Sequence, residues 1–290
     1  METIVYVNGR LVPKSQAFIS VYDSGFQHGD GVYEGIRCYD GKVFMLDEHI
    51  KRLFESAKAI GIDVGITPEQ MKDIVLRTLR ANPIKTNLHL RLQVTRGRKT
   101  VTGMNPKLCV DGPSIVVCVD YKEPIFNKSG VRLITSTFRR TRPDYLDPKV
   151  HNTNQLGQIL ANIEANRQGA DEAIMLDPNG FVAETNGTTL FMVKDGVVNT
   201  PTTDYILVGI TRGLVINLAS EGGYRVIERN ISLSEFYNAD EVFMCGTVGE
   251  IVPVSEIDGK PIGAKIPGPF TEWLMDEYRT LTENLGVPVD

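Results

Sequence analysis

The sequence predicts an α+β protein of two domains, and three observations support this. Strand-like and helix-like segments are mixed along 290 residues, 42% of them hydrophobic, so the chain can bury a sizeable core. A polar segment containing proline and glycine, residues 120–130, separates two apolar runs as an interdomain linker does. Short strands dominate after it. We therefore expect an N-terminal α+β domain at 1–119, a linker at 120–130 and a C-terminal domain at 131–290.

The first domain is expected to combine hairpins with two helices. An Asn8-Gly9 turn between Ile4–Val7 and Leu11–Val12 predicts a hairpin, and Asp40-Gly41 joins two further strand-like runs. Apolar residues on one face predict a helix over 47–60, and Pro68 begins a second helix. Alternation in LHLRLQVTRG predicts a half-buried strand, and the apolar run at 113–119 predicts a central one.

The second domain is expected to be rich in short strands. These fall at 131–137, 172–177, 190–193, 197–198, 225–228 and 241–245. Three helices are predicted between them, at 153–168, 211–222 and 269–284. In the first of these, Thr153 is the expected N-cap and Gly169 the end. Its helically spaced apolar residues predict a core-facing stripe: Leu156, Ile159, Leu160 and Ile163.

Composition excludes several classes of function. The net charge of −5 is spread without a basic patch, so nucleic acid is not an expected partner. No apolar segment reaches the length of a membrane span, and the first ten residues lack the features of a signal peptide, so we expect a cytoplasmic protein. The four cysteines are far apart without a CxxC pair, which argues against a metal site and is typical of reduced structural thiols.

Several motifs in order resemble a known family. Asp147-Pro148 and Val150 precede the helix at 153–168, and the blocks GADEAIMLD, GFVAE and KDGVVNTP follow. From Tyr6 to about Pro269 the chain resembles the fold-type IV aminotransferases that depend on pyridoxal phosphate, which include branched-chain and D-amino-acid aminotransferases and aminodeoxychorismate lyases. The resemblance implies an N-terminal α+β domain, a C-terminal pseudo-barrel, the cofactor in the cleft between them, and a homodimer.

Candidate cofactor residues follow from this resemblance. Such a cofactor needs an anion cradle, an acidic partner for its ring nitrogen and apolar cover for its ring. Glycines and threonines at a helix start or in a turn favour a phosphate, although glycine there is more often simple punctuation. The resemblance assigns the phosphate to Arg52, Gly209, Ile210, Thr211 and Thr247, the ring nitrogen to Glu184 and the ring face to Leu207. Gln155 and Thr189 depart from the family pattern.

One departure concerns the residue that bears the cofactor. The family has a lysine where this chain has His151. Lysine both holds the cofactor covalently and moves a proton, whereas imidazole can do only the second. Lys149 is a candidate substitute because residues two apart on a strand share a face. The other readings are a loosely held cofactor, a pseudoenzyme or a Lys-to-His substitution.

Candidate substrate residues lie on the strand at 88–95 and before it. The α-carboxylate needs a bidentate donor, and the resemblance offers Arg91 (branched-chain pattern) or Arg96 (D-amino-acid pattern). Tyr33 and His28 are expected to line the pocket. The leading function hypothesis is amino-group transfer between an amino acid or amine and a 2-oxo acid through the pyridoxal and pyridoxamine forms of the cofactor. The alternatives are a lyase of the aminodeoxychorismate type and a cofactor-binding protein without turnover.

Overall fold

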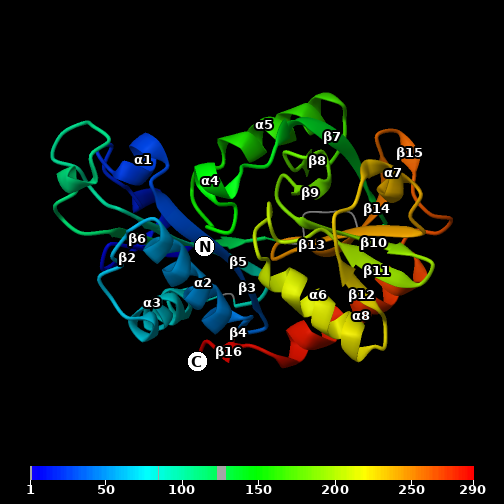
Figure 1. Ribbon diagram of the computed structural model, residues 1–290. Helices are drawn as coiled ribbons and strands as arrows, with labels where there is room; N and C mark the ends of the chain where they lie inside the picture. The colour runs from blue at the N-terminus through cyan, green and yellow to red at the C-terminus, as the bar shows by residue number, and fades with distance from the viewer. Residues whose placement is uncertain (1, 84, 123–128) are drawn as a thin grey trace. The chain divides into compact units, whose positions relative to one another are not determined.

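The protein divides into two compact units, each described here by itself. The computed structural model describes residues 2–83, 85–122 and 129–290 (Figure 1). Unit 1 comprises Met1–Glu123, Val150–Gln155 and Thr282–Asp290, and unit 2 comprises Pro124–Lys149 and Leu156–Leu281. Of the predicted linker, residues 123–128 lie outside the described residues, so the domain boundaries stay a prediction.

Unit 1 is built on a seven-stranded sheet with the order β16-β4-β3-β5-β6-β1-β2. Its strands are β1 (Ile4–Val7), β2 (Arg10–Pro13), β3 (Gly31–Tyr39), β4 (Lys42–Val43), β5 (Leu88–Thr95), β6 (Ser114–Tyr121) and β16 (Val287–Pro288). The Asn8-Gly9 hairpin is confirmed, and both turn residues have the positive φ that a tight hairpin turn requires. The central strand expected at 113–119 is β6, which lies between β5 and β1.

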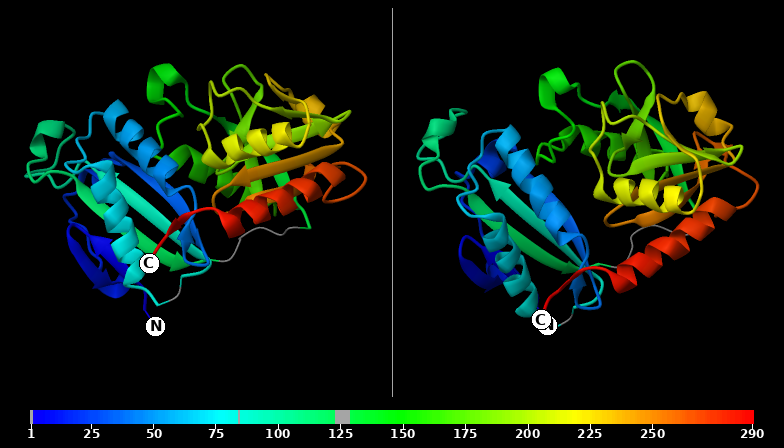
Figure 2. Two further views of the ribbon diagram at one scale, coloured as in Figure 1. Left: turned by 90° about the horizontal axis from the view of Figure 1, so that it is seen from below. Right: turned by 60° about the horizontal axis from the view of Figure 1, so that its bottom comes forward.

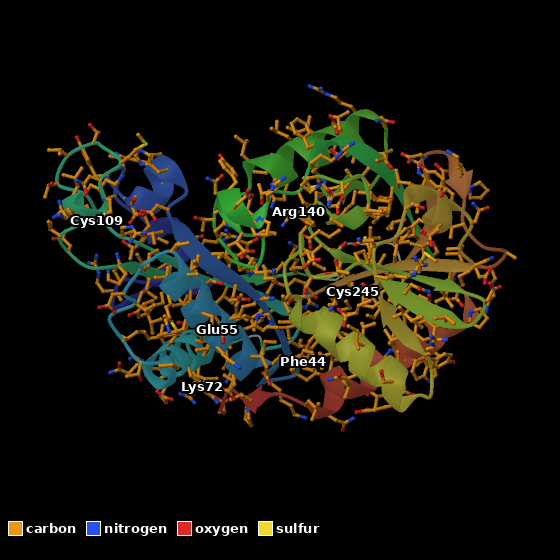
Figure 3. All side chains as sticks on the ribbon, in the orientation of Figure 1. Phe44, Glu55, Lys72, Cys109, Arg140 and Cys245 are labelled. Atoms are coloured by element: carbon orange, nitrogen blue, oxygen red, sulfur yellow. The ribbon has the colours of Figure 1, made fainter. Side chains whose placement is uncertain are left out.

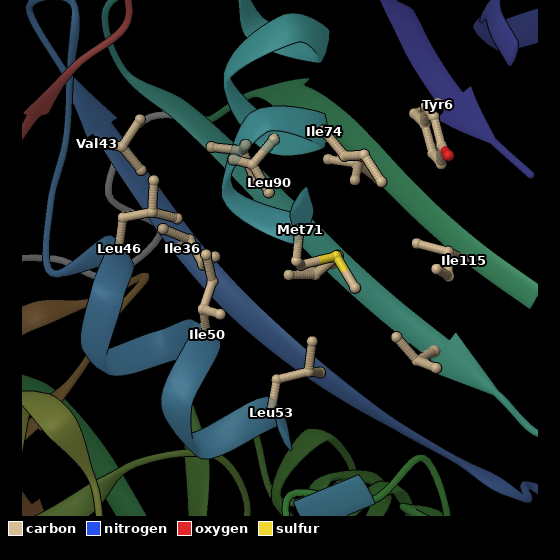
Figure 4. Close-up of a cluster of buried hydrophobic side chains, with 14 of the residues drawn as sticks. Tyr6, Ile36, Val43, Leu46, Ile50, Leu53, Met71, Ile74, Leu90 and Ile115 are labelled. Carbon is tan, nitrogen blue, oxygen red and sulfur yellow. The ribbon is translucent and has the colours of Figure 1, made fainter. Parts of the chain in front are cut away.

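Two long helices cover one face of this sheet. They are α2 (Leu46–Ala59) and α3 (Pro68–Arg80), both close to their predicted positions, and Thr67 with Gln70 forms a capping box at the start of α3. The further views show both helices on the same side of the strands (Figure 2). Apolar side chains such as Leu46, Ile50 and Leu53 of α2 reach towards β3 and β5 and form the core (Figure 4). The sequence did not predict the short helices α1 (Ser24–His28), η1 (Lys14–Gln16) and η2 (Pro106–Leu108).

Unit 2 is built on a nine-stranded mixed sheet with the order β12-β11-β10-β13-β14-β7-β8-β9, and β15 pairs with β14. The strands are β7 (Val131–Arg139), β8 (Glu172–Leu176), β9 (Val182–Thr185), β10 (Thr189–Lys194), β11 (Val197–Thr200), β12 (Val226–Glu228), β13 (Glu241–Gly246), β14 (Glu250–Ile257) and β15 (Lys260–Pro261). All six predicted strands are present. The sequence analysis missed β9, β14 and β15.

The helices of unit 2 complete the expected α+β class. The three predicted ones are α5 (Leu156–Arg167), α6 (Ile210–Glu221) and α8 (Pro269–Asn284). The expectation of only three was wrong, because α4 (Pro143–Leu146) and α7 (Leu233–Tyr237) are also helical. Among the helices of the described residues, none is both long and apolar enough to cross a membrane.

The orientation predicted for α5 was wrong. Leu156 is 62% exposed and Ile159 is 54% exposed, whereas Ala161 and Ala165 are fully buried against β7 and β8. Small residues at i and i+4 allow the helix to approach the sheet closely, and its larger apolar residues then face outwards. Thr153 is not the cap either, because its hydroxyl donates to the carbonyl oxygen of Gly29 at 2.6 Å.

Candidate functional site

The segment 150–155 is fixed to unit 1 by its backbone. Tyr33 of β3 donates its backbone N–H to the carbonyl oxygen of His151 at 3.0 Å, and Asn152 forms a bridge with Val32. The backbone N–H of His151 donates to Ser56 Oγ of α2 at 3.1 Å. His151 is therefore held at a defined place between a strand and a helix of the same unit.

The side chain of His151 faces a buried carboxylate, Glu34. Its Nδ1 lies 3.3 Å from Glu34 Oε1. Arg52 binds the same carboxylate in a bidentate manner, with Nε 2.8 Å from Oε1 and Nη2 2.6 Å from Oε2. His49 Nδ1 lies 2.7 Å from Oε2. One fully buried carboxylate thus joins a guanidinium and two imidazoles.

The electrostatics of this group favour an ionised Glu34 and a neutral His151. Burial by itself would raise the pKa of Glu34, but hydrogen bonds with Arg52, His151 and His49 outweigh it and hold that pKa well below the usual carboxyl range. Burial lowers the pKa of His151, and the neighbouring Glu34 only partly offsets this effect. His151 is therefore an imidazole with one free lone pair at neutral pH.

Tyr33 connects His151 to the predicted substrate residue Arg91. The rings of Tyr33 and His151 have centroids 4.1 Å apart, and Arg91 Cζ lies 3.8 Å from the centroid of the Tyr33 ring. Arg91 also donates from Nε to Gln93 at 3.0 Å. Four predicted site residues, Tyr33, Arg52, Arg91 and His151, therefore belong to one connected cluster in unit 1.

Arg96 and His28 have other contacts. Arg96 binds Asp30 through Nε and Nη2 at 2.8 and 3.0 Å and donates to the carbonyl oxygens of Ile60 and Gly61. These bonds connect the loop after β5 to the ends of α1 and α2. His28 is exposed on α1, where Lys99 Nζ lies 2.9 Å from its Nδ1. Arg91 rather than Arg96 therefore belongs to the His151 cluster.

The structure removes the reason for considering Lys149. This residue is exposed and lies in a turn, where its backbone N–H donates to Asp147 Oδ1 at 3.0 Å. The argument for Lys149 assumed that 149 and 151 share one face of a strand, and that assumption was wrong.

In unit 2, the predicted acidic residue Glu184 lies beside Leu207. The carboxylate of Glu184 is buried, accepts a hydrogen bond from the Leu207 backbone, and pairs with Arg140 Nη2 at 2.8 Å (Arg140 is labelled in Figure 3). Burial raises the pKa of Glu184 despite the favourable charge of Arg140. Two of the predicted cofactor residues are therefore neighbours, with an arginine that neutralises the acid.

Two backbone segments of unit 2 have the geometry of anion sites. Gly209 is the N-cap of α6, and no side chain among the described residues caps this helix through a hydrogen bond from that position. The amides of Ile210 and Thr211 thus begin a 12-residue helix, whose N-terminus attracts negative charge. An added Cβ at Gly209 would lie 3.3 Å from Thr189 Oγ1, so this approach is kept narrow. Thr247 lies in the turn after β13.

Sequence reasoning missed Glu34, His49 and Arg140. Glu34 follows Val32 and precedes Ile36 in the alternation of β3, so an acid in an otherwise apolar row was the available signal. His49 lies on the buried face of α2 together with Leu46 and Leu53, which was a comparable signal. For Arg140, the sequence offers no pattern beyond two consecutive arginines.

Comparisons with known proteins agree with this arrangement. The model of the family described as amino-transferase class IV matches residues 31–257. The chain is 46% identical to branched-chain-amino-acid aminotransferase-like protein 1 of Arabidopsis thaliana, covering 99% of this chain and 52% of that protein, so it spans about half the length of this relative. It is 45% identical to the putative branched-chain-amino-acid aminotransferase of Methanocaldococcus jannaschii, covering 98% of each.

Solved structures extend the similarity to the fold. The branched-chain aminotransferase of the archaeon Thermoproteus uzoniensis, solved with norvaline, superposes with a TM-score of 0.90 at 36% identity, covering 97% of this chain and 95% of that one. The order of the motifs, the elements that carry them and these similarities lead to one conclusion: the chain belongs to the class IV aminotransferase family.

Proposed function

We propose that this protein transfers an amino group between an amino acid and a 2-oxo acid, using pyridoxal phosphate that is bound without a covalent link. The observation that carries the proposal is the pairing of buried Glu34 with His151, at the position of the family's lysine, in a chain that otherwise has the family's motifs. An imidazole cannot form the covalent link, but it can accept and return a proton.

The residues present fit such a cofactor held non-covalently. The α6 N-terminus with Thr211, and the turn with Thr247, supply donors for a phosphate, and buried Glu184 supplies the acid for a pyridine nitrogen. Leu207 would cover the ring. Arg52 stays in the proposal as a phosphate ligand, although two of its nitrogen atoms are engaged by Glu34. When bound, the ring supplies an electron sink for the pair left on the substrate α-carbon.

The chain's own residues would then position the substrate and move its proton. Arg91, stacked on Tyr33, would bind the α-carboxylate through its guanidinium. His151 would take the α-proton and return it, because its imidazole is neutral and close to Tyr33. The substrates are therefore a small amino acid and a 2-oxo acid.

Borohydride reduction tests the mode of binding. The protein is equilibrated with pyridoxal phosphate, reduced, digested and analysed by mass spectrometry, while equilibrium dialysis measures the total bound cofactor. We expect saturable binding without a reduced adduct on any lysine. His151→Lys should yield an adduct at position 151, and Lys149→Arg is the matched control that should change neither result. A wild-type adduct on Lys149 would contradict non-covalent binding.

Turnover separates the proposal from its alternatives. With an amino acid added, the bound cofactor should convert to its amine form, and one equivalent of 2-oxo acid should appear. Pyruvate release from aminodeoxychorismate without a 2-oxo acid acceptor would favour a lyase. Binding without either product would favour a protein without turnover. We further propose that the protein is a cytoplasmic homodimer, as the sequence resemblance implies.

A further inference from the structure

Glu34 occupies an unusual place for a carboxylate. It lies in the apolar row of β3, between Val32 and Ile36, and its side chain is fully buried. Its partners come from two other parts of unit 1: His49 and Arg52 from α2, and His151 from the segment docked on β3. A buried charge is tolerated only when it is paired, and Arg52 supplies that pairing.

The contacts of His151 Nδ1 determine which ring nitrogen carries the proton. Nδ1 lies 3.3 Å from Glu34 Oε1, which can only accept, and 3.4 Å from Arg52 Nη2, which can only donate. Arg52 Nη2 already donates to Glu34 Oε2 at 2.6 Å. A proton on Nδ1 is directed at a full negative charge, whereas a bare lone pair there would face that charge. The Nδ1–H tautomer is therefore favoured, and the lone pair is on Nε2.

We propose that Glu34 is a positioning residue for proton transfer: it fixes His151 as the Nδ1–H tautomer so that Nε2 accepts the substrate's α-proton. This inference rests on the proposed function. In the step, the C–H bond of the α-carbon breaks, its electron pair stays with the substrate, and the proton forms a new N–H bond at Nε2. The resulting imidazolium is stabilised by Glu34 until Nε2 returns the proton.

The surroundings keep the ring in this orientation. The Tyr33 ring packs against the imidazole at 4.1 Å, and the backbone of His151 is bonded to Tyr33 and Ser56. The charged and titratable groups that face His151 are Glu34 and Tyr33 of β3 and Arg52 and His49 of α2, with Arg91 of β5 behind Tyr33. Glu34 is the one acid named in this group, so its removal should lower the imidazole pKa further.

The tautomer can be measured without cofactor. In protein labelled with ¹⁵N-histidine, long-range ¹H–¹⁵N spectra distinguish the two ring nitrogens, and the His151 signals are those lost in His151→Gln. We expect the Nδ1–H pattern in the wild type at neutral pH. Glu34→Gln should abolish that single pattern, whereas the exposed control Glu55→Gln on α2 should leave it unchanged. An Nε2–H pattern in the wild type would overturn the proposal even if Glu34→Gln did not fold.

A second readout connects the tautomer to chemistry. Cofactor-loaded protein in D₂O should exchange the α-hydrogen of an amino acid, and Glu34→Gln should slow this exchange by about tenfold or more with little change in KM. Equal exchange rates in wild type and Glu34→Gln would refute the positioning role. The expected tautomer combined with no exchange in the wild type would instead refute the proposed function.

Discussion

Glu172 at the start of β8 provides the sharpest test of how this fold handles a buried acid. Its side chain is almost fully buried, where it accepts hydrogen bonds from the hydroxyls of Thr185 and Thr188. Burial raises the pKa of Glu172 to about 7, from an ordinary value of 4.5, and the two threonines only partly oppose this. The folded protein therefore binds a proton here that the unfolded chain has already released.

The sign of the pH effect follows from this difference. Between about pH 4.5 and 7 the folded state holds more protons than the unfolded state, so the free energy of unfolding decreases as the pH rises. Each pKa unit corresponds to about 1.36 kcal/mol, which sets an upper limit of about 3 kcal/mol for the loss. Glu172→Gln is neutral at every pH, so the variant should lack this loss.

Urea unfolding followed by the fluorescence of Trp273 measures the effect. Trp273 is the single tryptophan, and it packs on Tyr224 and Phe270 in the same unit as Glu172. From pH 5 to pH 8, Glu172→Gln should gain stability relative to the wild type, whereas Glu221→Gln on the exposed end of α6 should not. Parallel pH profiles for wild type and Glu172→Gln would show that this carboxyl is ionised in the folded protein.

Three further predictions concern other parts of the molecule. Glu34→Gln should destabilise unit 1 by about 3–5 kcal/mol because Arg52 loses its buried partner, seen as amide hydrogen exchange in β3 at least about a hundredfold faster, with unit 2 unchanged. Cys38 and Cys245, whose pKa values burial raises to about 11 and about 12, should resist iodoacetamide until the protein is unfolded, as mass spectrometry will show. If the protein is a homodimer through the exposed face of α5, Ile159→Lys should yield monomers in sedimentation experiments.

Sequence reasoning worked best where the signal is local. The Asn8-Gly9 hairpin, the alternation of β5 and the capped start of α3 were all predicted, because each depends on neighbouring residues alone. The face that α5 buries was not predicted, because large apolar residues were expected to mark the core. In the structure, the close approach of α5 to the sheet selects Ala161 and Ala165 instead.

The candidate site shows a similar division. The family motifs identified Tyr33, Arg91 and His151, which the structure connects through stacked side chains. Arg96 was an equal candidate in sequence, because only tertiary structure reveals that its donors are engaged by Asp30 and backbone carbonyls. Glu34 was missed because its partners are distant along the chain, and a carboxylate in a strand ordinarily faces solvent.

The placement of His151 separates two tasks that a lysine would combine. Its backbone is held by Tyr33 and Ser56, so a change of side chain at 151 alters the chemistry while the supporting contacts remain. A proton carrier at this place needs only a lone pair and an oriented ring, and Glu34 and Tyr33 provide the orientation. A covalent hold needs an amine, which imidazole lacks. Retention of a cofactor then depends on its phosphate and ring contacts alone, and its binding should be reversible on dilution where a lysine-linked cofactor would remain bound.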